Sequence, residues 1–429
     1  MSVSDEQDRI ETGRVSRFLK MAGLATSLLA DKALGRAADG TISPQAAQRI
    51  ADALGQLKGP LLKMGQAMSY MTEFLPPEVT AILAKMQNNV PAMGYFFVAK
   101  QIEADLGGPV ERFFSSFERK AFAAASLGQV HRAVLKDGTP VAVKVQYPDM
   151  DRLVDSDLKT ARMLIEGLRL SAGRKYDVSD MFDEARIRVL EELDYRREAD
   201  NTDEFAAHFA DYDGVRVPKV YREASGARVL TLEMMPGKTL GQAIQDGMSQ
   251  EDRNHYGLLL IRMFWEEYFG LAMLHADPHP GNYLLHEGSI HLLDFGSVKR
   301  ISPEWQTASR LLLRGMLTDD DAMQLAGNEM AGYLQPGDSP EKVELVRQIW
   351  QMLFAPYRHD TFDFGVEGRI GASMQVMHDY AHQVGIRMPP DAIFVHRAAG
   401  GILATLFQMK SEGRFQDLIL PWVDESPQP

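Results

Sequence analysis

The chain has 429 residues, of which 45% are hydrophobic and 24% are charged, a composition that predicts a globular protein with two or three lobes. Its formal net charge of −13 argues against a nucleic-acid-binding surface, because phosphate backbones are bound by clustered lysine and arginine. The chain contains no cysteine, which excludes disulfide bonds, thiolate catalysis and cysteine-ligated metal sites.

The sequence predicts neither an N-terminal targeting signal nor a membrane-spanning helix. Four acidic residues precede any apolar stretch, so we expect the protein to stay in the cytoplasm. The segment Val15–Ala30 places leucines beside basic residues and could lie on a membrane surface, although such a stripe more often packs against its own protein. The most apolar stretch, Leu258–Leu274, is interrupted by charged residues and is not expected to span a bilayer.

Residues 44–87 have a helical pattern that is broken by glycine and proline. Within it, Lys63 and Gln66 share a face that differs from the apolar stripe, and Gly65 lies between them. A glycine here would let another backbone or a ligand approach closely. A solvated face is the simpler interpretation of this helix alone.

A helix near Phe97–Leu106 is followed by strands that begin near Phe117. Val130–Leu135 and Val141–Tyr147 predict a β-hairpin in which Lys144 projects from the face opposite the valines. The sequence Val-Ala-Val-Lys resembles the kinase strand whose lysine holds the α- and β-phosphates of ATP. An exposed strand lysine is the alternative.

The stretch Ala123–Gln129 stands where a kinase carries its glycine-rich phosphate loop. Alanine adopts positive φ less readily than glycine, so we expect the backbone amides to approach phosphates in a different way. A small-residue loop that only packs against a neighbour is the alternative.

An acidic helix is predicted over Val178–Phe209. Asp194 and Glu198 share one of its faces and could offer carboxylates to Lys144 and Lys63. Such an acidic run is more commonly a solvated surface.

The remaining strands of a small sheet are predicted at Val215–Tyr221 and Arg228–Glu233. Met234–Gly237 follows them as a natural hinge between lobes. From Leu240 onward the pattern is helical apart from one hairpin.

That hairpin belongs to the stretch from His275 to Gly296. Two short apolar runs flank Glu287-Gly288 and predict a tight β-hairpin. The hairpin brings Asn282 and Asp294 together at its open end.

The loop before this hairpin places Asp277 close to the same point. Carboxylate and amide oxygens suit Mg²⁺ carrying phosphates better than they suit zinc. The spacing is that of a kinase catalytic loop followed by its metal-binding Asp-Phe-Gly. An ordinary acidic hairpin with a proline-rich turn is the alternative.

Several motifs occur together and in order along the chain. They are Lys63-Met64-Gly65-Gln66, the alanine-rich sequence Ala123–His131, Glu192-Leu193-Asp194-Tyr195, His275–Asn282 and Asp294-Phe295-Gly296. With these motifs the chain resembles the UbiB/AarF family of atypical kinases, which is associated with ubiquinone biosynthesis and lipid homeostasis. The resemblance extends over roughly residues 40–420.

The resemblance implies an α+β, protein-kinase-like two-lobed fold with an N-terminal helical extension that covers the active cleft. The extension would occupy residues 1–112, a kinase-like N-lobe residues 113–236, and a helical C-lobe with the catalytic loop residues 237–429.

The resemblance also implies roles for individual residues. Asp277 would orient or deprotonate the acceptor, Lys144 would contact the nucleotide phosphates and pair with Glu198, and Asn282 and Asp294 would hold Mg²⁺. The residues that would close the pocket against peptides are Lys63, Gln66, Glu192 and Asp194. The other expected nucleotide contacts are Ala123, Ala124, Ala125, Ser126, Gly128, Gln129, Glu233 and Met235.

The implied activity is an Mg²⁺-dependent kinase or ATPase that binds ATP or ADP and serves a lipid pathway. A lipid or quinone precursor, other biosynthetic enzymes and a peripheral membrane contact are the expected partners. Ala276 replaces the arginine with which typical kinases read a phosphorylated activation loop, and no Ala-Pro-Glu follows Gly296, which favours a non-peptide substrate. The chain departs from the family at Ala121, where proline often stands, and lacks the C-terminal membrane spans of some bacterial members.

Two other functions fit parts of this pattern. One is a small-molecule kinase of the aminoglycoside or choline type, against which the Lys63-x-Gly65-Gln66 motif and Gly296 argue. The other is a nucleotide-gated scaffold with negligible turnover. Complete inactivity, though not slow turnover, is opposed by the retained Asp277, Asn282, Asp294 and Lys144.

Overall fold

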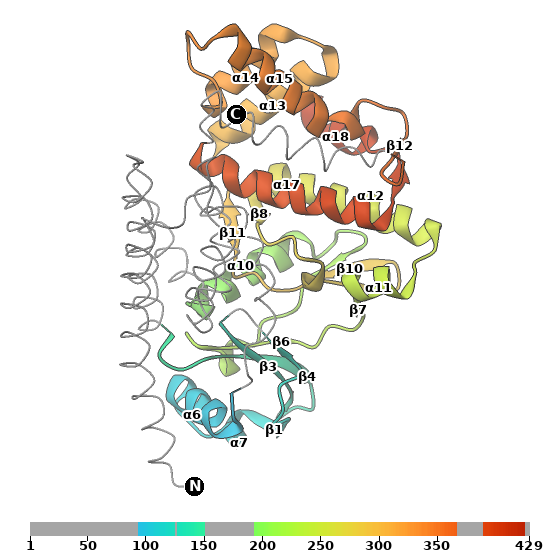
Figure 1. Ribbon diagram of the computed structural model, residues 1–429. Coiled ribbons are helices and arrows are strands. Elements are labelled where there is room, and N and C mark those ends of the chain that lie inside the picture. Colours follow the sequence, from blue (N-terminus) through green and yellow to red (C-terminus); the bar gives the residue numbers. More distant parts are fainter. Residues whose placement is uncertain (1–92, 125–126, 151–192, 367–388, 425–429) are drawn as a thin grey trace, which may run out of the picture. The chain divides into compact units, whose positions relative to one another are not determined.

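The computed structural model describes residues 93–124, 127–150, 193–366 and 389–424 (Figure 1). These residues belong to two compact units. The first unit contains the described residues up to Arg197 together with Tyr221–Leu232, and the second contains Glu198–Val220 and the chain from Glu233 onward. Both units contain helices together with strands that pair mostly antiparallel, as expected for an α+β protein. The three predicted domains, with boundaries at residues 112 and 236, stay a prediction.

The first unit is built on a five-stranded sheet of order β1-β3-β4-β6, with β2 paired to β3. The strands and helices are α6 (Tyr95–Leu106), α7 (Val110–Phe113), β1 (Phe114–Phe117), β2 (Ala123–Ala124), β3 (Gly128–Leu135), β4 (Pro140–Gln146) and β6 (Val229–Glu233). The predicted hairpin is confirmed, since β3 and β4 pair antiparallel with Val130 opposite Lys144.

Helix α6 is fixed to the sheet by packing and by one carboxylate. Val98 and Ile102 are fully buried in a core that includes the valines of β4. At the end of the helix Asp105 accepts hydrogen bonds from the backbone N–H groups of residues 227, 228 and 229, at 3.2, 2.7 and 2.9 Å. Three charge-assisted hydrogen bonds hold the loop before β6 in place.

The second unit contains one large core and the predicted catalytic hairpin. Strands β9 (Tyr283–His286) and β10 (Ser289–Leu292) pair antiparallel, with Leu292 opposite Tyr283. Glu287 and Gly288 both have positive φ, 47° and 77°, which is the geometry of a type I′ turn. This turn sets the register that brings the two ends of the hairpin together.

Most of the second unit is helical, and α12 and α17 lie side by side within it (Figure 1). The elements are α10 (Tyr195–His208, whose first residues belong to the first unit), β5 (Val215–Arg216), β7 (Lys238–Thr239), α11 (Leu240–Asp246), α12 (Gln250–Trp265), the π-helix η3 (Glu266–Gly270), β8 (Met273–His275), the 3₁₀ turn η4 (Pro280–Asn282), β11 (Val298–Arg300), α13 (Pro303–Thr318), α14 (Asp321–Ala331), α15 (Pro340–Leu353), β12 (Phe362–Asp363), α17 (Pro390–Met409), β13 (Glu412–Gly413) and α18 (Gln416–Asp424). No helix in the described part of the chain is long and apolar enough to cross a membrane.

Two predicted elements differ from the structure. The strand predicted at Val215–Tyr221 is only the short β5, which pairs in parallel with β10 and not with the small sheet. Asp194 does not lie on a helical face, because α10 begins at Tyr195. Its carboxylate accepts a hydrogen bond from the Arg196 backbone at 3.1 Å, as expected of a residue that precedes a helix.

Candidate active site

Backbone hydrogen bonds hold the predicted catalytic loop, His275–Asn282, against the hairpin that follows it. Asn282 accepts a hydrogen bond from the Leu293 N–H at 2.8 Å, which joins the two ends of the hairpin. Within the loop, the His279 N–H donates to the Asp277 carbonyl at 2.8 Å, and the Asn282 N–H donates to the His279 carbonyl at 2.9 Å. The predicted meeting of Asp277, Asn282 and Asp294 is therefore confirmed.

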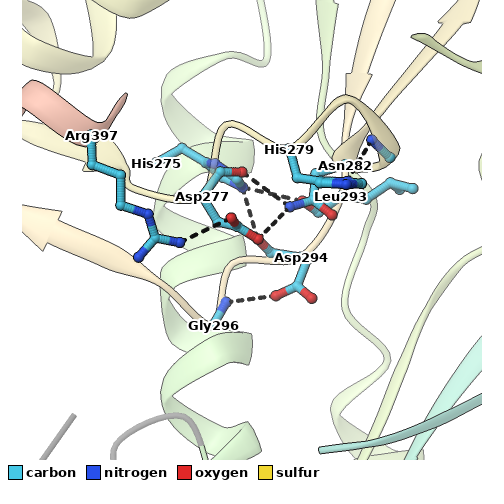
Figure 2. A network of polar contacts seen from close by, with 9 residues as sticks. His275, Asp277, His279, Asn282, Leu293, Asp294, Gly296 and Arg397 are labelled. Atoms are coloured by element: carbon cyan, nitrogen blue, oxygen red, sulfur yellow. Dashed lines mark hydrogen bonds and ion pairs between the residues drawn. The ribbon is translucent and has the colours of Figure 1, made fainter. Parts of the chain in front are cut away.

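Both carboxylate oxygens of Asp277 are engaged (Figure 2). The Asn282 side-chain amide donates to Oδ2 at 2.9 Å and to the Asp277 carbonyl at 3.0 Å. The Arg397 guanidinium, from α17, donates to Oδ1 at 3.1 Å. The side chains of Arg397 and Asp277 are about one-fifth exposed, at 20% and 19%, so the ion pair is partly shielded from water.

Asp294 has a left-handed backbone, with φ at 59°. Its Oδ1 accepts a hydrogen bond from the Gly296 N–H at 3.2 Å, and its carbonyl accepts one from the His275 ring at 2.8 Å. Phe295, which follows, is fully buried against the rings of Phe205 and His275. This side chain anchors the segment, so the uncommon backbone of Asp294 is imposed by its surroundings.

The chemistry of Asn282 and Asp294 fits a magnesium ion that arrives with phosphates. Because the Asn282 amide nitrogen is used by Asp277, its carbonyl oxygen remains as a ligand beside the Asp294 carboxylate. Among the described residues, no group of three or more His, Asp or Glu side chains could form a metal cage. Two oxygen ligands supplied by the protein are what Mg²⁺ commonly takes when phosphates complete its shell.

Glu198 lies near Asp294 in the second unit. It is 3% exposed, and a methyl group added to Gly296 would come within 3.5 Å of its Oε2 and 3.2 Å of Asp294 Oδ1. A side chain at Gly296 would therefore crowd the Asp294 carboxylate, whereas its contact with Glu198 would be an ordinary one. The predicted ion pair between Glu198 and Lys144 joins residues of different units and stays a prediction.

Lys144 is buried in the first unit, at 7% exposure, and its Nζ lies 5.0 Å from the centre of the Tyr195 ring. The neighbouring Gln146 donates to the Leu193 carbonyl at 2.8 Å. These contacts join β4 to the residues that begin α10. The alternative of an exposed strand lysine is excluded by the burial.

The alanine-rich stretch begins as a strand, because Ala123 and Ala124 form β2 and pair with Val130 and Gln129. The Gln129 amide is 1% exposed and bonds both backbone groups of Met93, at 2.7 and 3.1 Å. Its side chain therefore has a structural role, and only its backbone remains for a nucleotide.

Gly128 is required by close packing, since a side chain there would meet the Val145 carbonyl and the Tyr195 hydroxyl. At the predicted hinge, Glu233 is exposed and accepts from the Lys219 N–H at 3.2 Å, while Met235 is half-buried. Other predicted site residues lie outside the described residues, namely Lys63, Gln66, Ala125, Ser126 and Glu192.

Two residues of this site carry no sequence signal that assigns them to it. Arg397 lies 120 positions from Asp277 in the sequence, and nothing near it marks a catalytic segment. Glu267 lies on η3, is 2% exposed, and its Oε2 accepts from the His275 N–H at 2.9 Å. Burial raises the pKa of Glu267 to about 8, so this acid, one of the three charged residues that interrupt the apolar stretch, is neutral at pH 7.

The chain is similar in sequence to a known family and to named proteins. The family described as "ABC1 atypical kinase-like domain" matches residues 85–326. The chain is 35% identical to "Protein ACTIVITY OF BC1 COMPLEX KINASE 8, chloroplastic" from Arabidopsis thaliana over 64% of this chain and 37% of the relative. It is 28% identical to "Atypical kinase COQ8B, mitochondrial" from Rattus norvegicus over 97% of this chain and 82% of that protein.

A solved structure shares both sequence and fold with the chain. It is the complex of Rv3197 with erythromycin from Mycobacterium tuberculosis, at 28% identity and a TM-score of 0.62, covering 89% of this chain and 97% of that one. The chain spans well under half the length of the two Arabidopsis relatives, 37% of each.

Proposed function

Because the chain belongs to the family of ABC1 atypical kinase-like domains, we propose that it is an Mg²⁺- and ATP-dependent phosphotransferase or ATPase of the UbiB type that supports ubiquinone biosynthesis or lipid homeostasis. The observation that carries this proposal is the constellation of Asp277, Asn282 and Asp294 at the open end of one hairpin. It matches, in residue type and spacing, the acceptor-orienting and metal-holding residues of phosphoryl transfer.

Asp277 is positioned to act on the acceptor. Its carboxylate is held from two sides, by Asn282 and by Arg397, so it presents a fixed oxygen to a hydroxyl group or a water molecule. A pre-positioned carboxylate can orient the acceptor and receive its proton as phosphate transfer proceeds.

Asn282 and Asp294 would hold the magnesium ion, and Lys144 would hold the nucleotide phosphates. When bound, Mg²⁺ neutralises charge on the β- and γ-phosphates. The chain itself fixes the backbone of Asp294 through the buried Phe295 and the hydrogen bond from the His275 ring, and it holds the Asp294 carboxylate through the Gly296 N–H. Fixing these groups in advance removes the need to reorganise them during the reaction.

The proposed substrate is a lipid or quinone precursor rather than a generic protein. The alanine-rich stretch, the residue Ala276 in place of arginine and the predicted covering helix with Lys63 and Gln66 each oppose peptide phosphorylation. ATP, Mg²⁺, a lipid or phenolic ligand and a peripheral membrane contact are the partners we propose.

The test measures two quantities with the same protein preparation. ATP turnover is measured with and without vesicles of anionic phospholipid and a phenolic quinone-precursor mimic, and transfer of radiolabelled phosphate to a peptide library is measured in parallel. We expect Mg²⁺-dependent ATP turnover that increases when lipid or phenol is added. We expect the peptides to receive no radiolabelled phosphate. Asp294→Asn serves as the inactive control. Peptide labelling that is strong in the wild type and lost in this control would overturn the lipid-directed proposal, and absence of any metal-dependent turnover would overturn the enzymatic one.

A further inference from the structure

The second unit contains an apolar cavity of about 240 Å³ that the proposed chemistry does not use. Three of the four tryptophans in the chain, Trp265, Trp305 and Trp350, line it. Among the described residues that form its wall, none is Asp, Glu, Lys or Arg. An apolar cavity of about 150 Å³ in another protein holds benzene, so the larger volume here suits a fused two-ring system. A wall without charged side chains does not suit an ion or a nucleotide.

Within the described part of the chain, two hydrogen-bonded polar pairs lie on the cavity wall. In one, the Tyr268 and Ser309 hydroxyls bond each other at 2.6 Å. In the other, the Tyr333 hydroxyl and His396 Nε2 form a hydrogen bond of 2.7 Å. Burial lowers the pKa of His396 to about 4, so its ring is neutral at pH 7. Tyr333 is the one hydrogen-bonding partner of that ring among the described residues. The neutral ring therefore has its Nδ1 left to bond one hydroxyl or carbonyl oxygen of a ligand.

Helix α17 connects this cavity to the catalytic loop. Residues four apart share a helical face, and His396 and Gly400 both line the cavity. The adjacent face carries Arg397, which holds Asp277, and Gly401, where an added side chain would clash with Pro278 of the catalytic loop. A shift of α17 that accommodates a ligand on the first face must therefore move groups that contact the loop on the second.

We propose that the cavity binds an uncharged aromatic molecule of about two fused rings bearing one hydroxyl or carbonyl oxygen, and that its occupancy is coupled through α17 to the position of Asp277. The binding stands independently of the proposed function, whereas the coupling rests on it.

The binding test uses calorimetry with 1-naphthol, and 1-naphthoate serves as a charged control of the same ring size. The variant Gly400→Leu is designed to extend into the cavity, because Gly400 lines it and a Cβ added there would meet no atom within 4 Å. Ala404→Leu makes a comparable change at an exposed position of the same helix. Melting temperatures show whether each variant is folded, and leucine favours a helix more than glycine does.

We expect saturable one-site binding of 1-naphthol to the wild type and to Ala404→Leu, at least about 10-fold weaker binding to Gly400→Leu because the added side chain occupies the space of the ring, and no binding of 1-naphthoate. Any one of three results overturns the site. They are undiminished binding of 1-naphthol to folded Gly400→Leu, tight binding of 1-naphthoate, and no saturable binding of 1-naphthol to the wild type.

The coupling test measures ATP turnover during the same titration. We expect 1-naphthol to change the turnover of the wild type at least about 2-fold, with a midpoint equal to its dissociation constant, and to leave that of Gly400→Leu unchanged. Saturable binding with unaltered turnover overturns the coupling alone. A protein without any turnover would overturn the proposed enzymatic function while leaving the calorimetric result intact.

Discussion

Arg397 holds Asp277 across 120 positions of sequence, through a hydrogen bond of 3.1 Å from its guanidinium to Oδ1. One helical turn later on α17, Gly401 permits close contact with Pro278, the residue after Asp277. The catalytic loop is thus supported by its own hairpin on one side and by a distant helix on the other. The position of the proposed acceptor-orienting carboxylate depends on both.

Substitution of Arg397 tests this support. Arg397→Ala is expected to lower ATP turnover by on the order of 10- to 100-fold, because a misplaced reactive group loses rate steeply. Arg397→Lys should restore part of the activity, since it keeps the charge but not the planar geometry. The control is Arg414→Ala, which removes an exposed arginine that also pairs with an aspartate, at 2.9 Å. Turnover that is equal in all variants would mean that Arg397 does not position Asp277.

Asp294→Asn is expected to reduce turnover by on the order of 100-fold or more, because it removes one charged group that would hold magnesium. Folding should survive, since asparagine tolerates the left-handed backbone that Asp294 adopts. The matched control is Asp319→Asn, which makes the same chemical change at an exposed residue with φ at 52°. Comparable loss of activity in both variants would point to a general effect on folding. Wild-type activity in Asp294→Asn would remove its assignment as a metal ligand.

Lys144→Met is expected to weaken nucleotide binding or turnover by on the order of 10-fold or more, because it removes the charge that would hold the phosphates while retaining a long apolar side chain. Equilibrium binding of a fluorescent ATP analogue and steady-state turnover measure the two effects. Lys136→Met, in the exposed turn of the same β-hairpin, is the control. If both variants bind nucleotide like the wild type, Lys144 has only a structural role over the Tyr195 ring.

The buried acid Glu267 predicts a dependence of stability on pH. Its pKa is raised by burial from 4.5 to about 8, so the folded state retains a proton that the unfolded state loses first. The contribution of Glu267 to the free energy of unfolding is therefore fully present below about pH 4.5 and falls as the pH rises to about 8. Above that value it no longer changes with pH. Denaturant unfolding between about pH 5 and pH 8 measures this loss, which is on the order of a few kcal/mol.

Glu267→Gln should flatten that dependence, because a neutral amide does not ionise and can still accept from the His275 N–H. Glu329→Gln, at an exposed carboxylate, should leave the slope as in the wild type. If Glu267→Gln shows the same pH slope as the wild type, Glu267 does not carry this proton.

Sequence alone determined the features that depend on local order. The hairpin of β9 and β10 follows from two apolar runs around Glu287-Gly288, and it is enough to bring Asn282 to Asp294. The valine alternation of β4 likewise predicted the pairing of β3 with β4. Close neighbours in sequence have few possible arrangements, so periodicity and turn chemistry suffice for them.

Tertiary structure alone decided the features that depend on distant packing. Nothing in the sequence near Arg397 points to Asp277. The partner of a long side chain on a helix depends on which distant segment packs against that face of the helix. Burial keeps Glu267 neutral at pH 7. A sequence pattern does not report burial, so the sequence alone predicts a charged residue at this position of the apolar stretch. The strand at Val215–Arg216 pairs with β10 and not with the small sheet. The packing of the whole core decides which strands pair, and the residues of this short strand would suit either sheet equally well.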